Sequence, residues 1–153
     1  MQKQKGATIL EIILVMAIFA TLFGFITISL LSSTAKASFQ GALSVLIADI
    51  QSQQQRAISV DTDNGVYFTQ NNYTVFAGSS YTPSNASNFV IALEEDLEFS
   101  DISLPNDSII FEKRNGEAVG FSPNQHTVTI KNTLTNEQKT IQINRYGVIT
   151  QIQ

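Results

Sequence analysis

One acidic residue, Glu11, stands at the head of an otherwise charge-free apolar segment near the start of the chain. No charged residue occurs over the 24 positions from Ile12 to Ala35. An ionised side chain in such a segment is costly, about 2.5–3.5 kcal/mol at the middle of a bilayer, and usually has a function. Glu11 is therefore a candidate for pairing with a cation. At the level of lipid headgroups it would cost little, and that plainer interpretation stays open.

Other residues able to do chemistry are few. The chain has no cysteine and one histidine, His126, which excludes thiolate and multi-histidine metal sites. His126 enters a predicted strand from a turn, and we expect it to be exposed. The sequence contains no phosphate-binding glycine loop and no nucleophile elbow. We therefore predict a protein that is not an enzyme and that uses no cofactor and no metal.

A run of acidic residues in the second half of the chain is the one charge cluster. Several carboxylate oxygens suit calcium, but the spacing matches no EF-hand, and a solvated rim or a subunit contact is favoured. The run consists of Glu94, Glu95, Asp96, Glu98 and Asp101.

Composition and charge narrow the class of protein. The 153 residues include 9 basic and 13 acidic side chains, for a formal charge of −4, and 43% of residues are apolar. The acidic balance argues against a broad nucleic-acid surface. Because the apolar residues are concentrated near the N-terminus, the pattern indicates a membrane-targeted protein with a modest soluble domain.

The N-terminal elements must position Glu11. A polar leader, residues 1–6, carries Lys3 and Lys5, and residues 7–35 predict a helix that is long enough to span a ~30 Å hydrocarbon core. Basic residues ahead of the helix predict a cytoplasmic N-terminus and a single-pass inner-membrane protein. Two alternatives are an uncleaved anchor and an ordinary secretory signal that is cut after Ala35-Lys36-Ala37, although its apolar run would be unusually long.

The helical pattern continues beyond the apolar segment. In residues 36–60, apolar positions at spacings of three, four and seven form a stripe on one face. Residues 61–153 read as short strands separated by turns, with alternating apolar and polar positions typical of antiparallel sheet. The stripe consists of Phe39, Leu43, Leu46, Ile47, Ile50, Ala57 and Ile58.

The N-terminus resembles the class III signal of type IV prepilins. Lys5-Gly6-Ala7-Thr8-Ile9-Leu10-Glu11 has the basic leader ending in glycine and the acidic residue at the fifth mature position. The resemblance implies cleavage between Gly6 and Ala7 by prepilin peptidase, N-methylation of Ala7 and an assembly role for Glu11. Ala7 departs from the commoner phenylalanine or methionine, which fits a minor pilin better than a major one.

The rest of the chain is similar to the GspH/FimT-type minor pseudopilins and minor pilins. Weak elements in the family's order carry this resemblance: Gln55-Arg56-Ala57-Ile58, Leu104-Pro105, Asn115-Gly116 and Arg145-Tyr146-Gly147. It implies an α+β type IV pilin fold, in which a long N-terminal helix, with an apolar half and an amphipathic half, packs on an antiparallel β-sheet domain.

The function implied is that of a structural subunit of a type IV pilus or a type II secretion pseudopilus. Its expected partners are other pilin subunits, reached through the N-terminal helix, the prepilin peptidase and an inner-membrane assembly platform. The alternative is a DNA-binding minor pilin of a natural-transformation pilus. In such pilins a C-terminal Gly-Arg-x-Lys/Arg motif contacts phosphates, and the matching stretch Gly147-Val148-Ile149-Thr150 lacks both basic residues, so a nucleic-acid partner is not expected. Three basic residues can still share an edge: Lys113, Arg114 and Arg145.

Overall fold

The computed structural model describes residues 8–123 and 125–152, with the side chains of 25–33 left out. Its first element is a helix, α1, which begins at Ile9 and ends at Val60. By their contacts the residues divide into two units, Met1–Ala37 and Ser38–Gln153, so the division falls within α1. The sequence predicts a helix from residue 7 to about residue 60, close to these bounds.

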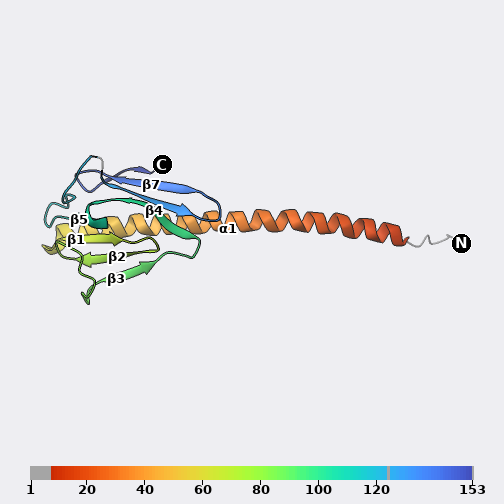
Figure 1. The fold of residues 1–153 in the computed structure, drawn as a ribbon, viewed down its shortest axis with the longest axis horizontal. Helices are drawn as coiled ribbons and strands as arrows, with labels where there is room; N and C mark the ends of the chain where they lie inside the picture. Colours follow the sequence, from red (N-terminus) through yellow and green to blue (C-terminus); the bar gives the residue numbers. More distant parts are fainter. Residues whose placement is uncertain (1–7, 124, 153) are drawn as a thin grey trace. The chain divides into compact units, whose positions relative to one another are not determined.

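All strands belong to the second unit and pair antiparallel (Figure 1). One four-stranded sheet has the order β3-β2-β1-β5, and the other has the order β4-β6-β7-β8. A short 3₁₀ helix, η1 (Pro105–Asp107), lies between β4 and β5. The strands are β1 (Asn64–Phe68), β2 (Asn72–Ala77), β3 (Phe89–Ala92), β4 (Leu97–Ser103), β5 (Ser108–Phe111), β6 (Thr127–Asn132), β7 (Gln138–Ile143) and β8 (Ile149–Ile152).

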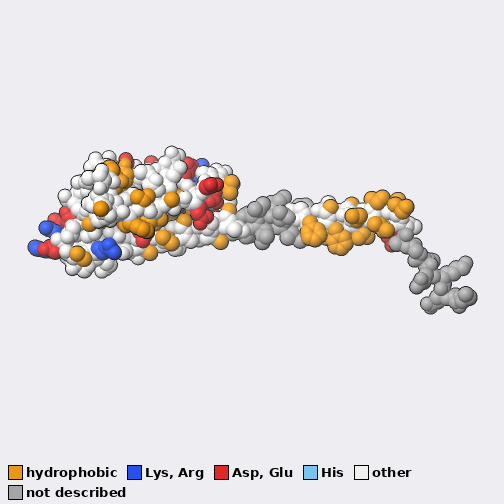
Figure 2. Space-filling model, turned by 90° about the horizontal axis from the view of Figure 1, so that it is seen from below, with side chains coloured by type: hydrophobic (Ala, Val, Ile, Leu, Met, Phe, Trp, Pro, Cys, Tyr) orange, Lys and Arg blue, Asp and Glu red, His pale blue; other side chains and the backbone are white. Residues whose placement is uncertain are grey.

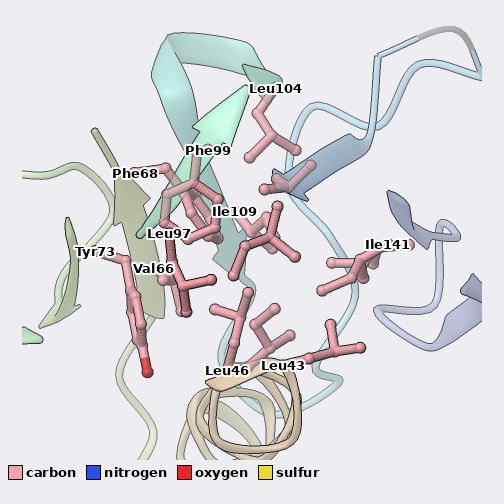
Figure 3. Close-up of a cluster of buried hydrophobic side chains, with 14 of the residues drawn as sticks. Leu43, Leu46, Val66, Phe68, Tyr73, Leu97, Phe99, Leu104, Ile109 and Ile141 are labelled. Carbon is pink, nitrogen blue, oxygen red and sulfur yellow. The ribbon is translucent and has the colours of Figure 1, made fainter. Parts of the chain in front are cut away.

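The core of the second unit forms where the later turns of α1 meet both sheets. In Figure 3, Leu43 and Leu46 of the helix point toward Val66 of β1 and Ile141 of β7. Phe39 and Leu46 are fully buried. The i, i+3, i+4 spacing puts these side chains on one face of the helix, and that face is the one that the sheets cover.

Gln54 attaches two turns, one after β5 and one before β8, to the end of α1. Its Nε2 donates to the carbonyl oxygens of Gly116, at 3.0 Å, and Tyr146, at 2.7 Å. Gly147 has a φ of +74°, and a Cβ there would lie 2.5 Å from Gln54 Nε2. Only glycine adopts this conformation without strain while leaving room for the amide. One helix residue therefore holds turns that belong to different sheets.

The predicted type IV pilin fold is contradicted in its sheet, because the strands form two separate sheets where one antiparallel domain sheet was expected. The difference begins at β4, in a region where the sequence analysis recognised only the run of acidic residues that includes Glu98 and Asp101. Asn132 Nδ2 donates to Asp96 Oδ2 at 3.0 Å, and the Thr133 amide donates to the Asp96 carbonyl at 2.8 Å. These bonds hold the start of β4 beside the end of β6, so β4 opens a second sheet instead of extending the first.

The predicted transmembrane helix over residues 7–35 is also contradicted. Within the residues that the structure describes, no helix is both long and apolar enough to cross a membrane. This finding also overturns the predicted single-pass inner-membrane location and the membrane-anchored pilin architecture.

Candidate assembly surface

The first turns of α1 carry a dense set of exposed apolar side chains, which we call the N-terminal apolar surface (Figure 2). Four consecutive residues, Ile12 to Val15, are 44–63% exposed. Because successive helix positions turn by about 100°, four in a row cover every side of the helix. The surface consists of Ile9, Leu10, Ile12, Ile13, Leu14, Val15, Met16, Ile18, Phe19, Leu22 and Phe23.

Glu11 lies inside this surface, in the first turn of α1. The turn is closed by the amides of Glu11 and Ile12, which donate to the Thr8 carbonyl oxygen at 3.0 and 3.2 Å. Glu11 lines a shallow hollow together with Ile12, Val15 and Met16, so its carboxylate has apolar neighbours. A negative charge is favourable near a helix N-terminus, and this position leaves Glu11 exposed and available to a cation from another molecule.

The predicted processing site cannot be placed beside Glu11. Gly6 and Ala7, and with them the whole predicted leader 1–6, lie outside the described residues. Leader cleavage and N-methylation of Ala7 therefore stay predictions from the sequence.

Comparison with protein-family models, with curated proteins and with solved structures finds no match for this chain. The assignment of a site therefore depends on the chemistry and geometry of the chain's own residues.

The acidic run does not form a shared cation site. Asp96 accepts from Asn132, Glu98 Oε2 accepts from Gln70 Nε2 at 3.0 Å, and Glu94 accepts from the Ser38 hydroxyl. Among the described residues, no group of three or more metal-ligating side chains is placed to hold an ion. The carboxylates of this run instead connect β4 and its preceding turn to neighbouring elements.

The basic residues that DNA binding would need are partly engaged by acids. Arg114 Nε lies 2.8 Å from Asp61 Oδ1, and Arg145 Nε lies 3.7 Å from Glu117 Oε2. An arginine that is paired with a carboxylate loses much of its attraction for phosphate. No contact in the described structure favours the DNA-binding alternative.

The prediction that His126 is exposed was wrong. The side chain is only 3% exposed, and the amide of Ser122 donates to its Nδ1 at 3.3 Å. The ring of Phe121 lies against it, with the ring centroids 4.7 Å apart. Burial lowers the pKa of His126, since the charged form is poorly solvated there. A neutral, packed histidine indicates a structural role.

The sequence analysis missed a polar contact between α1 and β2. The Tyr73 hydroxyl donates to Asp49 Oδ2 at 2.6 Å, and the Tyr73 side chain is 1% exposed. Burial and the neighbouring carboxylate raise the pKa of Tyr73 well above its usual range. Asp49 stands next to the apolar stripe in a polar position, but nothing in the sequence indicates which strand faces it.

Proposed function

We propose that the chain is a minor pilin or pseudopilin, a structural subunit of a type IV pilus or a type II secretion pseudopilus. The observation that carries the proposal is the N-terminal apolar surface, which is exposed on every side of α1 and interrupted by one carboxylate. A helix that is apolar all round is normally a buried one. Neighbouring copies of the same helix can supply that burial. The proposal concerns the role in a filament and includes neither the type IV pilin fold nor a membrane-spanning segment.

The energies favour association through this surface. Fully burying one large aliphatic or aromatic side chain contributes about 1.5–3 kcal/mol. Association costs an estimated 4–15 kcal/mol in lost freedom of motion. Burial of about half of the eleven side chains in the N-terminal apolar surface contributes about 8–16 kcal/mol, which is comparable with that cost. Contiguous exposed apolar surface of this kind is typical of interaction sites.

Glu11 would set the register of packing. In the proposed filament, removal of residues 1–6 gives Ala7 a free ammonium group, and the Glu11 carboxylate of a neighbouring copy neutralises it. Leaving either charge buried without its partner costs several kcal/mol. Helices that are out of register are therefore disfavoured.

Mass spectrometry of the protein isolated from its native cell tests the processing step. We expect a mature chain that begins with N-methylated Ala7. A chain that begins at Ser38 would instead identify an ordinary secreted protein and would exclude the pilin proposal.

Replacing Glu11 with alanine tests the assembly step. We expect Glu11→Ala to reduce recovery of the chain in sheared filaments at least tenfold, because the ammonium of the neighbouring copy loses its partner. Glu95→Ala is the matched control, since Glu95 is an exposed glutamate of the second unit. Normal incorporation of Glu11→Ala, or an equal loss with Glu95→Ala, contradicts the role of Glu11.

A further inference from the structure

The second unit has a hollow of about 430 Å³ between α1 and the end of β2. On the helix side it is lined by Asp49, Ser52, Gln53 and Arg56. Their spacing of three, one and three residues places them on one face of the helix. On the sheet side it is lined by residues of β2 and by Phe89, the first residue of β3. This polar part of α1 therefore lines a hollow, with Ser52 and Arg56 still exposed to solvent and Gln53 buried.

A second hollow, of about 280 Å³, lies on the same side of the unit. It is lined by apolar groups of α1, Ala42 and Val45, and by Ile91 of β3. Tyr73 lines this hollow, Asp49 lines the first, and their hydrogen bond stands between the two. We call the two hollows together the α1–β3 groove.

Two side chains of the first hollow lack partners within the described structure. Gln53 is 5% exposed, and its amide makes no hydrogen bond among the described residues, although its polar atoms still reach solvent in the hollow. The Arg56 guanidinium makes no ion pair with the described carboxylates, whereas Asp49 accepts from Tyr73. This end of the groove therefore suits a ligand that offers hydrogen-bonding groups and a negative charge.

The rim of the groove is an open strand edge. In the described structure β3 pairs with β2 alone, so its other edge has no strand beside it. Phe89 and Val90 are 66% and 58% exposed, and β3 contains no charged residue and no proline. Proteins usually protect such edges with charges or proline. Apolar side chains reach the surface on this side, which faces the viewer in Figure 2.

We propose that the α1–β3 groove binds an extended peptide segment of a partner protein that carries a carboxylate side chain. The segment adds as a strand to the free edge of β3, and its carboxylate reaches Arg56 beside the Gln53 amide. Main-chain hydrogen bonds then supply affinity, while the groove selects side chains. The inference is independent of the filament role, because it uses residues of the second unit only.

Fluorescence anisotropy with the full chain tests this site. The probe is a labelled, amidated hexapeptide of alternating valine and threonine that ends in glutamate. We expect saturable binding, weakened at least tenfold by Arg56→Gln and unchanged by Arg114→Gln, an exposed arginine outside the groove. Replacing the peptide glutamate with glutamine should weaken binding to the same degree, and should add nothing once Arg56 is replaced.

Two further measurements separate strand addition from simple charge attraction. A peptide with methylated backbone nitrogens should not bind, and binding of the unmodified peptide should slow hydrogen exchange in residues 89–92. Gln53→Leu should weaken binding without lowering the stability of the free chain. The proposal is overturned by absence of binding at 1 mM peptide, by equal binding of the methylated peptide, or by an unchanged affinity in Arg56→Gln.

Discussion

The same helix presents two different surfaces along its length. From Ile9 to Phe23 apolar side chains are exposed on all sides, whereas from Phe39 to Ala57 five apolar side chains on one face are buried and Val45 is the one large apolar side chain there that is mostly exposed. The later part has found its partner within its own chain, in two sheets. The large apolar side chains of the earlier part are each at least 44% exposed. Apolar side chains of the same kind therefore stabilise the fold in the later part of α1, and in the earlier part they are exposed to other molecules.

The largest expected change in stability comes from replacing one leucine in each part of the helix. Leu46 is fully buried, and Leu14 is 58% exposed. We expect Leu46→Ala to lower the free energy of unfolding by about 2–5 kcal/mol, because it leaves a cavity in the core, and Leu14→Ala to change it by no more than ~0.5 kcal/mol. Urea unfolding followed by circular dichroism measures both. Equal losses would show that the N-terminal apolar surface is covered within the chain.

The next test concerns glycines. Gly147→Ala brings a Cβ within 2.6 Å of the Gly116 carbonyl oxygen at a φ of +74°, and we expect a loss of about 1–3 kcal/mol in unfolding free energy. A Cβ at Gly41, within α1, has no heavy atom within 4 Å. Gly41→Ala should therefore stabilise the chain by up to about 1 kcal/mol. A harmless Gly147→Ala would mean that the turns do not depend on Gln54.

Tyr73 links the later part of α1 to β2, and its contribution depends on pH. We expect Tyr73→Phe to cost about 1–2 kcal/mol at pH 7, because the hydrogen bond to Asp49 is lost. Since folding raises the pKa of Tyr73, the hydroxyl's contribution is complete below pH ~10 and falls as the pH rises further. The unfolding free energies of the two proteins should therefore converge above pH ~10. A difference that stays constant to pH 11 contradicts this account.

The smallest effect is expected from His126. Folding lowers its pKa, so below pH ~6.5 the unfolded chain binds a proton that the folded chain does not. Stability should fall by about 1 kcal/mol or less between pH 7 and pH 5. The decline should be shallower in His126→Gln, as measured by thermal unfolding at each pH. If stability declined with pH equally steeply in His126→Gln, other titratable groups would be the cause of the decline.

The sequence predicted the later part of α1 well, because its buried face follows helical spacing. Phe39, Leu43, Leu46, Ile50 and Ala57 are all buried, although Ile58 is 43% exposed. Spacing is a local property, so one sequence suffices to read it.

Strand pairing was harder to predict. β4 was missed since Glu98 and Asp101 hide its alternation, and its pairing with β6 depends on Asp96 and on residues more than 20 positions away. The free edge of β3 could not be foreseen for the same reason, because an edge is defined by which strands are its neighbours. The residue type at Glu11 indicated chemistry from the sequence, whereas Arg56 drew attention only once the pairing of strands showed the hollow beside it.

The bonds made by Gln54 also limit which changes of length α1 can accept. One residue inserted between Ile50 and Gln54 turns the Gln54 side chain by about 100°, away from the Gly116 and Tyr146 carbonyls, and releases a turn of each sheet in one step. An insertion ahead of residue 38 leaves both bonds untouched. Insertions and deletions should therefore be tolerated unequally along one continuous helix, and variants of this protein should differ in length mostly before Ser38.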